Sequence, residues 1–184
     1  SGNANVPSVK SLEKVLAGNS WKTTRGLSTN LNTYIYGASH LLEIGDMSLC
    51  NSTEYSIATA TNLKELKIGD EVHPPVVATK LALSEGLPYS NLTKVDLTNV
   101  QFSQTVSLNL VMADGKNLMP ALQELKLKGS SLENLTLGDY TPITFLSLPD
   151  KIRNINMVNQ LVLKDLEIYG TDYVENITLQ NCPL

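Results

Sequence analysis

A short motif recurs along this chain and restricts the folds that it can adopt. The motif reads apolar, two variable residues, apolar, polar, apolar, any residue, and then Asp, Asn or Gly. Nine copies are recognisable, and their last apolar residues are Ile44, Ile68, Leu97, Leu127, Leu137, Leu148, Met157, Ile168 and Leu179. Internal repetition at a short period is typical of stacked repeat folds, in which each copy contacts mainly its neighbours.

The motif has the polarity of a strand followed by a turn. In the copy Leu122-x-x-Leu125-Lys126-Leu127-x-Gly129, two apolar residues flank one polar residue, which is the period of a half-buried strand. The Asp, Asn or Gly that follows is a turn residue. An antiparallel meander is the alternative, but it would not need the same polarity in every copy. The motif therefore predicts short parallel strands.

The spacing of the copies predicts two strands in each coil of the chain. The first three intervals are 24, 29 and 30 residues, and the later ones are 9 to 11 residues. A coil of about 10 residues could hardly enclose a core, whereas about 20 to 22 residues could. We assign the strands ending at Leu137, Met157 and Leu179 to a second face. The first face takes the strands ending at Ile44, Ile68, Leu97, Leu127, Leu148 and Ile168.

Longer segments take the place of the second face in the first half of the chain. We expect helices within 54–61, 76–86 and 106–118. The run from Val76 to Leu83 is followed by Gly86 and Pro88, which are helix-stop residues. A further helix over 7–17 begins at Pro7 and ends before Gly18. It would cover the first coil, so residues 1–38 are predicted to be an N-terminal helix and capping segment and residues 39–184 the repeat array.

From about residue 39 onward the chain resembles the leucine-rich repeat family. The matching residues are motifs such as Leu122-x-x-Leu125-x-Leu127, and the last copy extends to Cys182, where the family allows Asn or Cys. The resemblance implies an α/β fold, a right-handed solenoid with a parallel sheet on one face and helices, then short strands, on the other. It also implies protein binding through the concave strand face. We expect an irregular bacterial or phage type of repeat, from part of a longer chain.

Most copies depart from the family at the position of Asn or Cys. That position holds Glu71, Val100, Ser130, Tyr140 and Thr171. An asparagine ladder is therefore not expected there.

Asn134-Leu135-Thr136 and Asn176-Ile177-Thr178 fit the acceptor pattern for N-glycosylation, but an Asn-rich chain contains such triplets by chance.

The outward positions of the first face form two rows. The residue between the apolar pair is, copy by copy, Glu43, Lys67, Asp96, Lys126, Ser147 and Glu167. In a parallel stack, neighbours lie about 4.8 Å apart, and opposite charges on adjacent strands stabilise by about 0.2–1 kcal/mol. The alternating signs thus favour ladders that set the register and keep the face soluble. Docking of a protein is the functional alternative, with apolar anchors at Leu41 and Phe145. The candidate binding residues are His40, Leu41, Glu65, Lys94, Glu124, Phe145 and Asp165.

Composition and charge exclude several classes of function. The chain has 14 basic and 18 acidic residues, and aromatic residues are not interleaved with the basic ones, which argues against nucleic-acid binding. No apolar run reaches the ~18 residues of a membrane span.

Neither His40 nor His73 has a nucleophile or carboxylate at a spacing that indicates catalysis. Asp46 and Asp70 occupy equivalent turns, where stacked carboxylates could bind calcium, but turn chemistry already accounts for them. We expect no metal and no cofactor.

These observations predict a non-enzymatic protein-interaction or structural module within a larger surface or virion assembly. The partner is expected to be a protein or another part of the same assembly, at a bacterial cell surface or in a phage virion. The alternative is a β-solenoid that binds or cleaves carbohydrate, because a stacked solenoid can present paired carboxylates.

Overall fold

The computed structural model describes residues 14–16, 43–45, 52–57, 61–72 and 74–183. Within these ranges the chain forms fourteen short β-strands and no helix. The described residues accordingly include no helix that is long and apolar enough to cross a membrane. The predicted α/β class is wrong for this part of the chain, which consists of parallel sheets.

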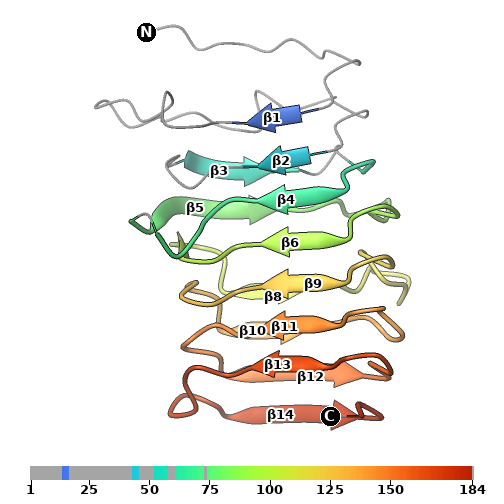
Figure 1. Ribbon diagram of the computed structural model, residues 1–184. Coiled ribbons are helices and arrows are strands. Elements are labelled where there is room, and N and C mark those ends of the chain that lie inside the picture. Colours follow the sequence, from blue (N-terminus) through green and yellow to red (C-terminus); the bar gives the residue numbers. More distant parts are fainter. Residues whose placement is uncertain (1–13, 17–42, 46–51, 58–60, 73, 184) are drawn as a thin grey trace, which may run out of the picture.

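The largest sheet has seven strands, and every pairing in it is parallel (Figure 1). Its order is β1 (Lys14–Leu16), β2 (Glu43–Gly45), β4 (Glu65–Lys67), β6 (Lys94–Asp96), β9 (Glu124–Lys126), β11 (Phe145–Ser147) and β13 (Asp165–Glu167). The strands predicted for the first face are therefore adjacent and parallel, as the motif indicates. Strand β1 extends this sheet and lies inside the segment where we predicted a helix over 7–17; the rest of that segment is outside the described residues.

A second sheet contains the strands predicted for the other face. Its order is β14 (Asn176–Gln180), β12 (Asn154–Val158), β10 (Asn134–Thr136) and β8 (Ser107–Asn109), again all parallel. Strand β8 replaces the start of the helix predicted over 106–118. The remainder of that segment turns back on itself around Asp114 and Gly115, with an antiparallel bridge between Val111 and Asn117.

A third sheet has the order β3 (Ser52–Ser56), β5 (Val76–Ala82) and β7 (Val100–Phe102). Its strands β3 and β5 overlap the segments where we predicted the other two helices. Residues 58–60 of the segment 54–61 lie outside the described residues. In β5 the side chains of Val76 and Ala78 are buried, whereas Val77 is 53 % exposed. This burial has the period of a strand, and the β-branched residues of β5 favour that conformation. The predicted helix over 76–86 is therefore wrong.

From β2 to β14 the chain alternates between the seven-stranded sheet and the two smaller ones, apart from the step from β7 to β8, which passes from one smaller sheet to the other. Figure 1 shows the smaller sheets behind the larger one. The space between them is filled by buried Leu, Ile and Val side chains that recur at each level, such as Leu66, Val95 and Leu125. Each level therefore repeats a similar interior, which is filled mainly by aliphatic side chains; Tyr89 and Phe102 are the buried aromatic residues among those described.

The register of the seven-stranded sheet follows the motif except at one strand. From β4 to β13 the central buried residues are aligned, as in the pairing of Leu66 with Val95. At β2, however, Ile44 pairs with Leu66 and Glu43 with Glu65, whereas the motif aligns Glu43 with Lys67. A shift of two residues leaves the same residues on the same face of the sheet, so the hydrophobic pattern could not exclude it.

Asparagine ladders run across the four-stranded sheet. In the strand ladder, the amide of Asn176 donates to Asn154 (2.7 Å) and that of Asn154 donates to Asn134 (2.6 Å). Asn134 in turn donates to the hydroxyl of Ser107 (2.9 Å). In the turn ladder, Asn181 donates to Asn159 (2.8 Å), which donates to Asp139 (3.1 Å). Both ladders lie outside the position that the leucine-rich repeat family uses.

The outer surface of the four-stranded sheet carries no ionisable side chain at its strand positions between Ser107 and Thr178. We call this surface the neutral face. Its first two rows consist of Ser107, Asn109, Asn134, Thr136, Asn154, Asn156, Asn176 and Thr178, and the longer strands β12 and β14 continue it with Val158 and Gln180.

Candidate binding surface

The outer surface of the seven-stranded sheet is the predicted binding surface, and we call it the charged face. In β4, β6 and β9 the central residue is buried and its two neighbours are more accessible, because successive side chains alternate across a strand. In β11, Leu146 is buried and Phe145 is partly exposed. The charged face consists of Glu65, Lys67, Lys94, Asp96, Glu124, Lys126, Phe145, Asp165 and Glu167.

Five of the seven predicted site residues lie in one row of the charged face. The backbone register pairs Glu65 with Lys94, Lys94 with Glu124, Glu124 with Phe145, and Phe145 with Asp165. The other two predicted residues, His40 and Leu41, lie outside the described residues. The structure thus brings together side chains that come from residues 65 to 165 of the chain.

The second row differs from the prediction at Ser147. We expected this side chain on the surface, but the residue is only 2 % exposed. Its hydroxyl accepts a hydrogen bond from the backbone amide of Leu127 on the neighbouring coil (3.1 Å). Ser147 therefore joins two levels of the stack and does not offer a contact to a partner.

Lys126 connects the two rows near their centre. Its Nζ lies 2.7 Å from Oε1 of Glu124 on the same strand and 5.7 Å from the centre of the Phe145 ring on the next. The hydrogen bond to Glu124 raises the pKa of Lys126, with smaller contributions from Asp96 and Glu167. The ion pair thus runs along a strand, whereas we predicted pairs between strands.

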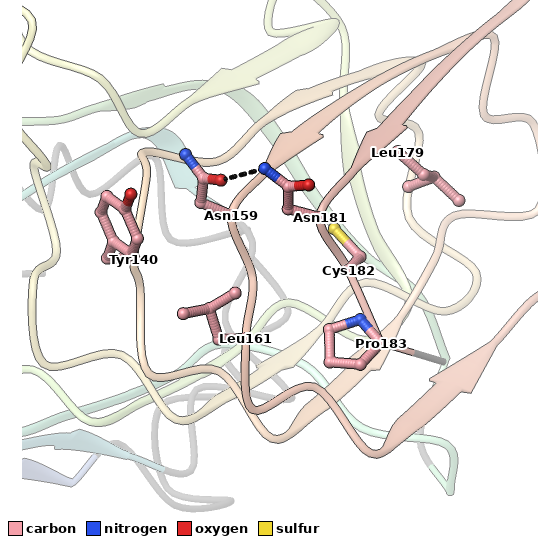
Figure 2. A pocket seen from close by; sticks show the side chains of 7 residues that line it. All are labelled: Tyr140, Asn159, Leu161, Leu179, Asn181, Cys182 and Pro183. Carbon is pink, nitrogen blue, oxygen red and sulfur yellow. Dashed lines mark hydrogen bonds between the residues drawn. The ribbon is translucent and has the colours of Figure 1, made fainter.

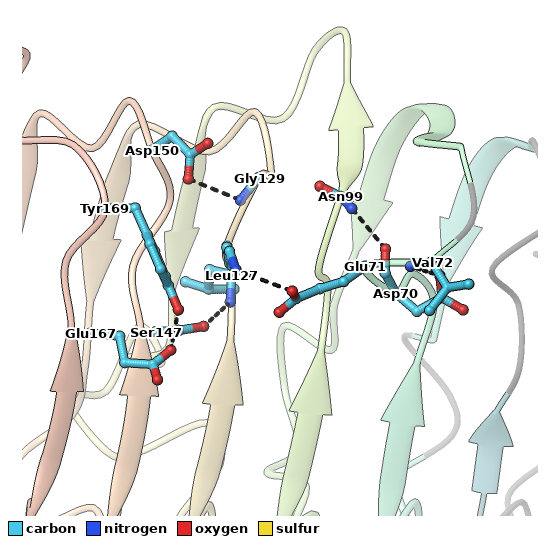
Figure 3. Close-up of polar contacts among 11 residues, drawn as sticks. Asp70, Glu71, Val72, Asn99, Leu127, Gly129, Ser147, Asp150, Glu167 and Tyr169 are labelled. Atoms are coloured by element: carbon cyan, nitrogen blue, oxygen red, sulfur yellow. Dashed lines mark hydrogen bonds and ion pairs between the residues drawn. The ribbon is translucent and has the colours of Figure 1, made fainter.

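The charged face continues past the ends of its strands to Glu71, Lys128 and Tyr169. Nζ of Lys128 lies 3.1 Å from Oε2 of Glu71 and 4.6 Å from the centre of the Tyr169 ring. The hydroxyl of Tyr169 donates a hydrogen bond to Glu167, as Figure 3 shows, and this bond raises the pKa of Tyr169. The result is a connected group of two acids, one lysine and one aromatic ring.

Sequence reasoning missed Lys128 and Tyr169, although the motif contains a signal for them. Both occupy the variable position directly before Gly129 and Gly170. The register of β9, β11 and β13 places both residues just after the same end of aligned parallel strands. The motif allows any residue at this position, and the aromatic contact of Lys128 could not be read from one copy of the motif alone.

The turns beside this group use their polar atoms for the fold. The carboxylate of Asp70 accepts a hydrogen bond from the amide of Val72 (3.0 Å), and the side chain of Asn99 donates to the carbonyl of Asp70 (2.7 Å) (Figure 3). Asp150 likewise accepts from the amide of Gly129 (3.2 Å). Asp46 lies outside the described residues. Among those that are described, no group of three His, Cys, Asp or Glu side chains could hold a metal ion.

A hollow of about 630 Å³ lies at the turns that follow the four-stranded sheet (Figure 2). It is lined by Tyr140, which is 65 % exposed, and by Asn159 and Asn181 of the turn ladder. Leu161, Leu179, Cys182 and Pro183 complete the lining. The hollow combines one aromatic ring with amides that already hydrogen-bond to each other.

No protein-family model, curated protein or solved structure matches this chain. The site is therefore defined by the geometry described above.

Proposed function

We propose that this chain is a leucine-rich-repeat-like, right-handed solenoid that binds a protein partner through its charged face, without enzymatic activity. The alternation of the chain between sheets and the shared register of the strands support the solenoid. The partner belongs to a larger surface or virion assembly, at a bacterial cell surface or in a phage particle.

The observation that carries this proposal is the pairing of a partly exposed ring, Phe145, and an exposed ring, Tyr169, on this face with a lysine each. Phe145 lies beside Lys126, and Tyr169 lies beside Lys128. Aromatic residues dominate the binding energy of protein interfaces, because they bury a large area at a small cost in conformational entropy. Phe145 and Tyr169 are therefore the expected anchors.

The charges around the anchors define the kind of partner. Glu124 neutralises Lys126, and Glu71 neutralises Lys128. A face that neutralises its lysines attracts phosphate chains weakly, because nucleic-acid affinity depends on unneutralised positive charge. A protein surface with mixed charges is the better match.

The proposal is tested with the double variant Phe145→Ser/Tyr169→Ser. Wild-type protein, this variant and Asn156→Ala on the neutral face are immobilised and exposed to an extract of the source, and a captured protein is then purified for affinity measurement. We expect the partner to bind wild type and Asn156→Ala alike and to lose affinity for the double variant by about tenfold or more. Equal affinity for all three, or release of soluble sugars from a glycan by the wild type, would contradict the proposal.

A further inference from the structure

The neutral face differs from the charged face because its strand positions hold no ionisable side chains, and the proposed function makes no use of it. Its first two rows hold only amide and hydroxyl side chains from β8 to β14. Five of the eight are exposed, and Asn134, Thr136 and Asn154 are partly buried. Charged residues precede the strands, where Arg153 pairs with Glu133 (3.0 Å) and with Glu175 (2.7 Å). This cluster holds one positive and two negative charges, so its arginine is not a free cation for a ligand.

The first row of the neutral face is occupied by its own hydrogen bonds. Asn134, Asn154 and Asn176 form the strand ladder, which ends on Ser107. An Asn side chain offers two N–H donors and one carbonyl oxygen, so each ladder residue fixes its neighbour's orientation. This row is a rigid platform.

The second row lies on the same platform and has free hydrogen-bonding groups. Thr136, Asn156 and Thr178 are aligned by the register of β10, β12 and β14. No described residue hydrogen-bonds to any of these three side chains, whereas Asn109, the fourth member, accepts a bond from the amide of Val111 (3.1 Å). Donors and acceptors therefore repeat along the row at the strand spacing of about 4.8 Å.

The row leads into a groove at the β8 edge of the sheet. The groove has a volume of about 600 Å³, and Ser107 and Asn109 form part of its lining. Ser84 and Glu85, which follow β5, line it as well, together with apolar residues such as Leu83 and Met112. An extended ligand bound along the row would thus reach further polar groups at its end, inside the groove.

We propose that the neutral face binds an extended, uncharged polysaccharide, with Thr136, Asn156 and Thr178 in contact with the sugar hydroxyls and the groove beside β8 receiving one end. Sugar hydroxyls are neutral donors and acceptors, which amides and hydroxyls match without an ion-desolvation cost. A nucleic acid or an acidic glycan would need cations that this face lacks. A protein partner would need exposed apolar anchors, which the two rows do not contain.

The test measures binding to purified polysaccharides by affinity gel electrophoresis. The panel contains a neutral β-glucan, a mannan and a galactan, with alginate and polygalacturonate as acidic counterparts. We expect the wild type to be retarded by at least one neutral polymer and by neither acidic one. The triple variant Thr136→Val/Asn156→Ala/Thr178→Val should lose that affinity by about tenfold or more, because its three polar groups are replaced without a change of backbone.

Lys94→Ala on the charged face is the matched control and should bind like the wild type. If the triple variant does not give the circular dichroism spectrum of the wild type, Asn156→Ala alone serves in its place, with a smaller loss of the same sign. Absence of retardation by every neutral polymer, equal binding by the variants, or preference for the acidic polymers would overturn the proposal. None of these results bears on the charged face, which is tested separately.

Discussion

Leu125 and Lys126 are adjacent residues whose environments are opposite. Leu125 is fully buried between neighbouring levels, whereas the side chain of Lys126 is 40 % exposed and pairs with Glu124. Leu125→Asp places a charge in the apolar interior and is expected to unfold the array. Lys126→Ala should cost less than about 1 kcal/mol, because exposed ion pairs contribute little. Urea unfolding followed by circular dichroism compares the two, and similar midpoints would refute the assigned orientation of β9.

Tyr89 is a fully buried phenol that connects two loops. Its hydroxyl donates to the carbonyl of Ile57 (2.7 Å) and accepts from the amide of Ser84 (2.9 Å). Tyr89→Phe leaves both backbone groups without this partner, and should cost about 1–3 kcal/mol in the free energy of unfolding at neutral pH. Thermal and urea unfolding measure this cost; a change near zero would show that water replaces the hydroxyl.

The same residue predicts a pH dependence. Burial raises the pKa of Tyr89 above its usual range, so the folded protein retains the proton that the unfolded chain loses near its ordinary pKa of about 10. Its contribution is present below that pH and is lost as the pH rises above it. The stability difference between wild type and Tyr89→Phe should therefore shrink above about pH 10. A difference that stays constant to higher pH would contradict the assignment.

At the scale of the elements, the turns between strands depend on specific glycines. Gly129 has φ of +67°, and a Cβ there would lie 2.0 Å from Oδ1 of Asn99. Gly129→Ala is therefore expected to destabilise by more than about 1 kcal/mol. Gly86→Ala is the control, since a Cβ at Gly86 meets nothing within 4 Å, and it should change stability by less than about 0.5 kcal/mol. Equal effects in urea unfolding would show that the turn rearranges.

The strand ladder makes a second prediction at this scale. Asn154 donates one amide bond to Asn134 and accepts another from Asn176, while Asn156 on the same strand takes part in neither. Asn154→Ala should cost about 1–2 kcal/mol, because two hydrogen bonds are lost and two neighbours lose a partner. Asn156→Ala should be close to neutral. Differential scanning calorimetry of both variants distinguishes a ladder that stabilises the sheet from one that is incidental.

The elements also show how far the sequence determines this structure. The pattern of an apolar pair around a polar residue predicts β6, β9 and β10 correctly, because each exposes one side to water. The run from Val76 to Leu83 was wrongly predicted to be a helix. A partly covered strand has apolar residues on both faces, and such a run fits the hydrophobic pattern of a helix as well as that of a strand. The two-residue offset at β2 could not be predicted either, since both registers place Ile44 on the same face.

The candidate site was predictable as a row but not as a group of contacts. The repeat aligns Glu65, Lys94 and Glu124 whatever their side-chain conformations, and the register confirms that row. Lys128 contacts Glu71 and Tyr169, which lie on different levels of the stack. Alternative contacts of a long, exposed side chain differ little in free energy, and no single copy of the motif specifies which one forms.

For the molecule as a whole, the stack leaves β14 as an edge strand of its sheet in the described part of the chain. Ile177 is 51 % exposed and Leu179 is 40 % exposed, although the equivalent residues of β12 are buried. Exposed apolar edge strands promote association through added strands. Sedimentation velocity is expected to show concentration-dependent association of the wild type, reduced in Ile177→Lys. Thr178→Lys adds the same charge on the outer face and should associate as the wild type does; equal behaviour of the two variants would contradict an apolar cause.

The asparagine ladders also give the four-stranded sheet a chemical direction. In every rung the residue of higher number donates and the residue of lower number accepts, from Asn176 down to Ser107 and from Asn181 down to Asp139. Aligned amides polarise one another, so the direction is reinforced along the ladder. The rung at β14 consequently presents an amide oxygen outward. A strand added beside β14 continues the ladder when it supplies an N–H donor at that position. The two edges of the sheet therefore accept different strands, so that the sheet can be extended in a directional way.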